Sequence, residues 1–197
     1  LLRYVETYSR ICHNDISGVI VETGDRSPIL DFIARTHSNC ECYHTESDLR
    51  IEIDVESAFA DVVFSFEVFE HIKDKPETEF SEVVLFQESG ARSYTNDISR
   101  ILKGNGDLYV TTPNPTSSFV QQRVLTGEAP MVFRPHVREY TKEEIIGIFN
   151  DFELRRYDTM YNFFLLNDGK HRLAEVFELT GASASERGDD HFFHFRK

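Results

Sequence analysis

The chain has 197 residues, of which 40% are hydrophobic, and this suits one globular domain with its own core. Its formal net charge of −13 at pH 7 argues against nucleic-acid and anionic membrane partners, because such a field repels phosphate groups. No apolar run approaches the roughly 20 residues that span a bilayer, and three cysteines are too few for a disulfide framework. We therefore expect a single cytoplasmic domain over residues 1–197. The sequence does not indicate its oligomeric state.

Apolar runs predict strands that alternate with helices along the chain. The expected strands are residues 18–22, 40–44, 61–65, 108–112, 152–157 and 191–195. The expected helices lie within residues 1–17, from Pro28 onward, over residues 67–72, up to Leu102, and from a capping box at Thr141 through Phe149. This alternation predicts a doubly wound, mainly parallel α/β sheet with helices on both faces. The last two strands are expected to pair antiparallel at one edge.

Residues 73–90 interrupt the alternation. They are acidic and irregular and contain Pro76, so we expect a surface insertion there. We find no internal repeat and no second domain in the sequence.

Ligands of a doubly wound sheet bind at the carboxyl ends of its strands, so the residues there are the first site candidates. The first strand ends in Glu22-Thr23-Gly24-Asp25, where a glycine allows a ligand to approach the backbone closely. The second is followed by Glu46 and Asp48, and a carboxylate at that place can accept both hydroxyls of a ribose. An ordinary strand-ending turn and a solvated acidic loop are the alternative explanations.

A cluster of Glu67, Glu70 and His71 follows the strand over residues 61–65. On a helix these three side chains would share roughly one face, and two carboxylates would favour the protonated imidazole. The cluster would suit a general base, a substrate clamp or a hard-cation site. A salt network at a helix end explains it equally well.

Three segments resemble the class I S-adenosylmethionine-dependent methyltransferases of small molecules. Residues 61–72 are similar to the segment that follows their fourth strand, residues 101–114 to their strand-five hairpin, and residues 136–141 to the opening of a late helix. The matches occur in the family's order, and the resemblance covers about residues 18–154.

The resemblance implies S-adenosylmethionine as the cofactor and assigns residues to it. The implied cofactor-binding residues are Glu22, Thr23, Gly24, Asp25, Glu46, Asp48, Leu49, Ser65, Phe66 and Glu67. The turn at Gly24 would lie against the methionine and sugar, and Glu46 would bind the ribose. Asp48 and Leu49 would contact the adenine, and the Ser65 segment would line the methionine end.

The sequence departs from the family pattern at two places. Arg26 and Ser27 stand where the family has further glycines, and their side chains would narrow the approach of the cofactor. The interval between Gly24 and Asp61 is also short, so we expect one edge strand to be missing. The assignments of Glu46 and Asp48 could then exchange.

The implied reaction is methyl transfer to a small-molecule acceptor, with oxygen as the expected target. His71 and His136 are the candidate bases, although His136 would equally suit a structural role before the capped helix. Residues 113–140, hereafter the cap, would cover the acceptor. Some quinone-directed relatives hold a divalent ion with a Glu-x-x-Glu-His grouping, which Glu67, Glu70 and His71 match; no metal is predicted here, since that face could be internal.

Two other functions are considered. A catalytically silent methyltransferase-like module with a binding role would explain the missing glycines. A nicotinamide-dinucleotide oxidoreductase is disfavoured, because the G-x-G-x-x-G fingerprint is absent.

Overall fold

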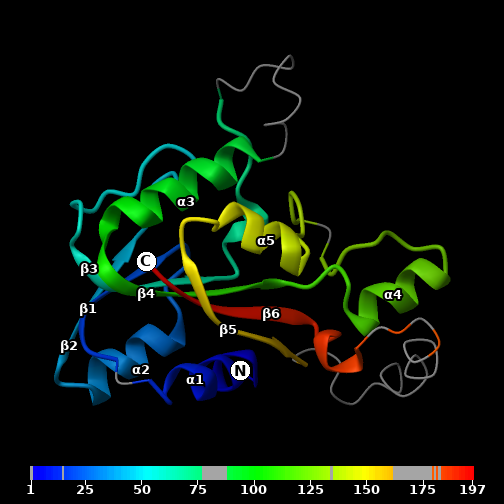
Figure 1. The fold of residues 1–197 in the computed structure, drawn as a ribbon, viewed down its shortest axis with the longest axis horizontal. Coiled ribbons are helices and arrows are strands. Elements are labelled where there is room, and N and C mark those ends of the chain that lie inside the picture. The colour runs from blue at the N-terminus through cyan, green and yellow to red at the C-terminus, as the bar shows by residue number, and fades with distance from the viewer. Residues whose placement is uncertain are drawn as a thin grey trace.

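A computed structural model describes residues 2–14, 16–76, 88–133, 135–161, 179, 181 and 183–197. Its core is a six-stranded sheet with the order β2-β1-β3-β4-β6-β5 (Figure 1). The strands are β1 (Gly18–Thr23), β2 (Cys40–Thr45), β3 (Ala60–Phe66), β4 (Leu102–Pro113), β5 (Glu153–Met160) and β6 (Asp190–Arg196). The helices are α1 (Leu2–Ile11), α2 (Pro28–Thr36), α3 (Ser89–Ile101), α4 (Ser118–Leu125) and α5 (Lys142–Ile148).

The sheet has the predicted doubly wound topology. Strands β1 to β4 are parallel, and the chain reverses its winding between β1 and β3, which are neighbours. The two late strands pair antiparallel as expected. However, β6 lies inside the sheet between β4 and β5, so only β5 forms the edge.

Successive residues of each central strand point to opposite faces and build two cores. On one face, Ile20 and Phe64 pack in a cluster with side chains of α1 and α2. On the other face, Val21 and Val63 pack in a cluster with side chains of α3 and α5. Figure 1 shows these two helix pairs on opposite sides of the sheet, so the predicted helices on both faces are confirmed.

The missing edge strand is replaced by an irregular segment. Residues 46–59, all described, contain no strand, and β2 is the edge of the sheet. Arg100 of α3 donates to the carbonyl oxygens of Ile53 and Val55, at 2.7 Å each. Asp97 accepts a hydrogen bond from the Ile53 amide. Because α3 holds this segment by its backbone, the residues that follow β2 have a fixed place beside the sheet.

The predicted helix over residues 67–72 is wrong. Glu67 adopts a positive φ of 56°, and only a short 3₁₀ turn, Phe69–His71, follows it. The Glu67 amide still donates to the Thr111 carbonyl at 2.9 Å, so the chain leaves β3 through a sharp bend at this residue. Glu67, Glu70 and His71 therefore do not share a helix face.

The ends of the expected insertion, residues 73–90, lie together. Asp74 accepts hydrogen bonds from the Ser89 amide and hydroxyl at 3.1 and 2.9 Å. Gly90 packs so closely on the Lys73 backbone that a Cβ there would overlap the Lys73 carbonyl oxygen. Residues 77–87 lie outside the described residues. None of the described helices is long and apolar enough to cross a membrane.

We predict that Gly90→Ala lowers the free energy of unfolding by about 1–3 kcal/mol, the usual range for overpacking. Gly147→Ala is the matched control, because nothing lies within 4 Å of the added methyl group in α5. There alanine should stabilise the helix, by up to about 1 kcal/mol. Urea denaturation measures both variants, and equal effects would contradict the close contact at Gly90.

Candidate active site

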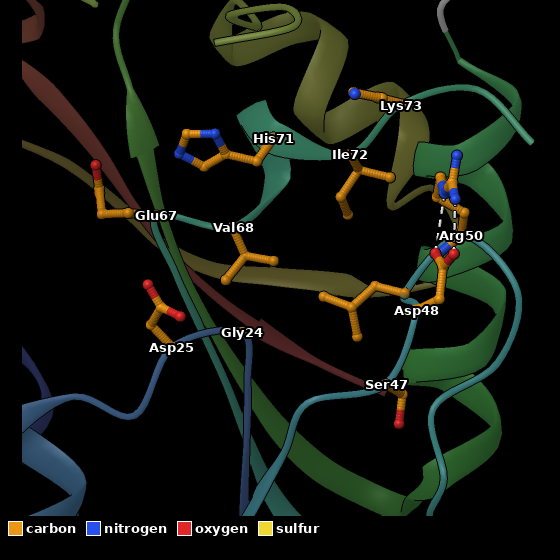
Figure 2. A pocket seen from close by; sticks show the side chains of 11 residues that line it. Gly24, Asp25, Ser47, Asp48, Arg50, Glu67, Val68, His71, Ile72 and Lys73 are labelled. Carbon is orange, nitrogen blue, oxygen red and sulfur yellow. Dashed lines mark hydrogen bonds and ion pairs between the residues drawn. The ribbon is translucent and has the colours of Figure 1, made fainter. Parts of the chain in front are cut away.

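A cavity of about 420 Å³ opens at the carboxyl ends of the strands beside the point where the winding reverses (Figure 2). Two lining residues follow β1, four follow β2 and five follow β3. The lining residues are Gly24, Asp25, Ser47, Asp48, Leu49, Arg50, Glu67, Val68, His71, Ile72 and Lys73. This is where a doubly wound sheet is expected to bind a ligand.

Five of the ten predicted cofactor residues line this cavity: Gly24, Asp25, Asp48, Leu49 and Glu67. Four others are buried at the ends of the strands: Glu22, Thr23, Ser65 and Phe66. Glu46 is exposed and does not line the cavity. The structure therefore brings the loops together as predicted, but it places Asp48 rather than Glu46 at the cavity.

Gly24 is the closest approach between the loops after β1 and β3. Its φ is +82°, and a Cβ at this position would overlap Cγ2 of Val68. The Gly24 carbonyl accepts a hydrogen bond from His44 Nε2 of β2 at 2.6 Å. Glycine is needed here both for the left-handed conformation and for the contact.

Arg26 and Ser27 do not fill the cavity. Arg26 is about half exposed and forms an ion pair with Asp31 of α2 at 2.7 Å. Ser27 is the N-cap of α2 and accepts a hydrogen bond from the Leu30 amide. The departures from the glycine-rich pattern thus stabilise the start of α2 and leave the cavity open.

Glu22 and Tyr94 form hydrogen bonds with residues on both sides of the turn at Gly24. Glu22 is fully buried, its Oε2 accepts the Ser27 amide at 2.8 Å, and burial raises the pKa of its carboxyl group. Tyr94 of α3 bonds through its hydroxyl to Thr23 and Ser65, the latter at 2.8 Å. The side chains of Thr23 and Ser65 are therefore engaged within the protein.

An ion pair stands at the β2 side of the cavity. Arg50 binds Asp48 through two contacts of 2.9 and 2.7 Å, drawn as dashed lines in Figure 2. These contacts lower the pKa of the Asp48 carboxyl group. Asp48 was expected at the adenine, and its pairing with Arg50 could not be read from the sequence pattern.

A second cavity of about 400 Å³ adjoins the first. The two share the lining residues Asp25, Glu67 and His71. The second is further lined by Arg3, Glu70, Pro113, Phe119, Val132, Phe133 and His136. It therefore lies between α1, the turn after β3 and the cap.

The floor of the second cavity is acidic and buried. Glu67 forms an ion pair with Arg3 of α1 at 3.2 Å, and Glu70 accepts a hydrogen bond from the Thr112 hydroxyl at 3.0 Å. The Oε1 atom of each glutamate finds no hydrogen-bond partner in the described part of the chain. Burial raises the pKa of both carboxyl groups, and the charge of Glu67 raises that of Glu70 further.

Both predicted bases lie at this cavity. The His71 side chain is 49% exposed, and its ring lies 4.9 Å from that of His136. Burial, and then the neighbouring His136, lower the pKa of His71, so its imidazole is neutral at pH 7. His136 is buried, and its Nδ1 lies 2.6 Å from Glu139.

Glu70, His71 and His136 form a group that could hold a metal ion. One potential ligand atom from each lies within 4.8 Å of the others. Imidazole and carboxylate are ligands that divalent transition metals accept. The sequence grouping pointed to Glu67 instead of His136, but Glu67 is engaged by Arg3.

Comparison with known proteins identifies the chain. A family model described as a methyltransferase domain matches residues 9–158, about three quarters of the sequence. The chain belongs to this methyltransferase family. The loops at Gly24 leave an open cavity at the switch point of the sheet, which is where a doubly wound methyltransferase would bind its methyl donor. No curated protein sequence matches significantly.

Three solved methyltransferase structures are similar in fold to this chain. An S-adenosylmethionine-dependent methyltransferase from Archaeoglobus fulgidus has a TM-score of 0.61 at 13% identity, over 100% of this chain and 93% of that one. Phosphoethanolamine N-methyltransferase 2 of Haemonchus contortus, solved with S-adenosylhomocysteine, has a TM-score of 0.59 at 14% identity, over 99% and 52%. The small RNA methyltransferase HEN1 has a TM-score of 0.61 at 14% identity, over 99% and 25%.

The cavities also include residues that the sequence did not single out. Val68, Ile72 and Lys73 lie in or beside the segment that resembles the family, so their place could have been inferred from it. Arg3 of α1 gave no signal, because its ion pair with Glu67 joins two elements that are distant in the sequence. Arg50 pairs with Asp48 only two residues away, but the residue types did not mark that contact as part of a site.

We predict that Gly24→Ala weakens binding of S-adenosylhomocysteine at least tenfold, because the methyl group would push Val68 and the loop after β3 away from the cavity. Gly127→Ala is the matched control: Gly127 has nearly the same φ, +81°, but nothing lies within 4 Å of its added methyl. Both carry the strain of a left-handed alanine, and only Gly24→Ala should lose affinity. Isothermal titration calorimetry decides, and equal affinities would contradict the role of the contact.

A pH dependence follows from Glu22. Because its pKa is higher in the folded state, the native protein binds this proton more tightly, so the stabilisation is present below about pH 4.3 and is lost as the pH rises through the folded value. We predict that Glu22→Gln loses less stability than the wild type between pH 4.5 and pH 8. Urea denaturation across this range measures the difference, with Glu46→Gln as the exposed control. If the free energy of unfolding of Glu22→Gln falls with pH as steeply as that of the wild type, Glu22 is not the group responsible for the pH dependence.

Proposed function

We propose that this methyltransferase transfers a methyl group to an oxygen atom of a small molecule bound in the second cavity. The observation that carries the proposal is the junction of the two cavities at Asp25, Glu67 and His71. A donor in the first cavity and an acceptor in the second would meet there, and holding two reactants in line can supply about 7–11 kcal/mol of barrier reduction.

The size and lining of the second cavity support a small molecule. A volume of about 400 Å³ is within the range of ordinary ligand pockets. Phe119, Val132 and Phe133 give it an apolar wall, which suits a ring, and the floor is polar. Arg3 is the one cationic side chain among its lining residues, and it faces Glu67, so the cavity offers little to a phosphate backbone.

His71 is the proposed general base. S-adenosylmethionine supplies an electrophilic methyl group on a sulfonium. The neutral imidazole of His71 would accept the proton of the acceptor hydroxyl while the oxygen–carbon bond forms and the carbon–sulfur bond breaks, which leaves S-adenosylhomocysteine. Glu67 would place a carboxyl group beside the reacting groups at the junction.

The group Glu70, His71 and His136 supports a second form of the same chemistry. A divalent ion bound there would lower the pKa of a coordinated hydroxyl, as such ions do for water. His71 would then serve as a ligand, and the reaction would depend on added metal.

The assay that tests the proposal incubates the protein with methyl-labelled S-adenosylmethionine and a panel of phenols, catechols and primary amines. Each reaction is run with EDTA, Mg²⁺ or Mn²⁺, and mass spectrometry locates the methyl group. Products methylated on oxygen support the proposal, and metal dependence separates its two forms. Methylation of amines alone would overturn the oxygen assignment.

We predict that His71→Asn lowers the rate of methyl transfer by about 10²–10⁴, the usual contribution of a general base. The affinity for S-adenosylhomocysteine should fall far less, since His71 is one of many residues at the first cavity. His13→Asn, at an exposed position after α1, is the control. A rate within threefold of the wild type in His71→Asn would remove this residue from the mechanism.

A further inference from the structure

Glu139 is a buried carboxylate that neither the sequence pattern nor the resemblance singled out. It belongs to the cap, and its side chain is 2% exposed. It accepts hydrogen bonds from the Val132 amide at 2.8 and 2.9 Å and from the Phe133 amide at 3.2 Å. Its Oε1 also lies 2.6 Å from His136 Nδ1.

All three partners of Glu139 line the second cavity. The Glu139 side chain therefore binds the backbone of Val132 and Phe133, which lie in the apolar wall of the cavity. It also contacts His136, which lines the same cavity. The same segment is attached to the turn after β3, because the Val137 amide donates to the Glu70 carbonyl at 2.8 Å. Glu139 thus holds three cavity-lining residues of the cap together, and the Val137 amide attaches the same segment to the turn after β3.

The contact with His136 also selects a tautomer. An ionised carboxylate can only accept, so His136 Nδ1 must carry the proton in this hydrogen bond. In the neutral ring, Nε2 then keeps its lone pair. Since Nδ1 is bonded to Glu139, Nε2 is the ring nitrogen of His136 that remains available to a ligand of the cavity.

We propose that Glu139 is a positioning residue of the acceptor cavity: it holds Val132 and Phe133 in the cavity wall and sets His136 as the Nδ1–H tautomer, which leaves Nε2 with its lone pair. The inference rests on the proposed function only in taking the second cavity as the acceptor site. Carboxylates that orient a histidine in this way typically change metal affinity or activity 10–100-fold when they are removed.

Nitrogen-15 NMR of the protein labelled at histidine tests the tautomer without any substrate. In the neutral ring, wild-type His136 should show a protonated Nδ1 and an unprotonated Nε2. Glu139→Ala should give a mixture of both tautomers, and Glu139→Gln should restore the wild-type signal, because its amide oxygen can still accept the Nδ1 proton. A protonated Nε2 in the wild type would overturn the proposal, whether or not any variant folds.

Amide hydrogen exchange tests the hydrogen bonds from Glu139 to the Val132 and Phe133 amides. In Glu139→Ala, exchange at Val132 and Phe133 should quicken at least about tenfold, the factor for one lost hydrogen bond to a charged group. Glu128→Gln is the matched control, because Glu128 lies in the same cap but is exposed and pairs with Arg123. Unchanged exchange together with an unchanged tautomer in folded Glu139→Ala would overturn the inference. Transfer to nitrogen with the expected NMR and exchange results would overturn the proposed function alone.

Discussion

The contact between Gly24 and Val68 is the constraint on which the rest of the site depends. The loops after β1 and β3 meet there without room for a Cβ, both residues line the first cavity, and their neighbours Asp25 and Glu67 line both cavities. A parallel sheet places these loops at the same edge, but the pleat alone leaves their separation undefined. The absent side chain at Gly24 and the bend at Glu67 set that separation, and so decide where two ligands can touch.

The scarcity of glycine after Gly24 has a structural explanation in Glu22 and Ser27. A glycine-rich turn gives a ligand access to free amide groups at the start of a helix. Here the Ser27 amide is bound by the Glu22 carboxylate, and the Ser27 side chain caps α2. The turn therefore satisfies its own hydrogen bonds and still leaves the cavity unfilled, which removes the main support for a silent module.

Apolar patterning predicted the sheet well because buried parallel strands are apolar on both faces. The run over residues 61–65 lies within β3 for this reason. The same patterning failed over residues 67–72, since nothing in the residue types signals the positive φ of Glu67. The association of His136 with Glu70 and His71 depends on how the cap folds, and Glu139 was not identified as a site residue although it lies in the segment that resembles the family. Strand order and loop identity were thus predictable, whereas side-chain partners across the site were not.

The acidic floor is unfavourable for folding taken alone. Burial raises the pKa of both Glu67 and Glu70, the charge of Glu67 raises that of Glu70 further, and Arg3 forms an ion pair with Glu67. Under the proposed function, a positively charged ligand would stabilise the ionised form of these carboxyl groups, each of which has one oxygen without a hydrogen-bond partner in the described part of the chain. A sulfonium donor on one side of Glu67 and a cation beside Glu70 on the other would each supply that charge. The instability of the free floor and its affinity for the reacting groups therefore have the same electrostatic origin.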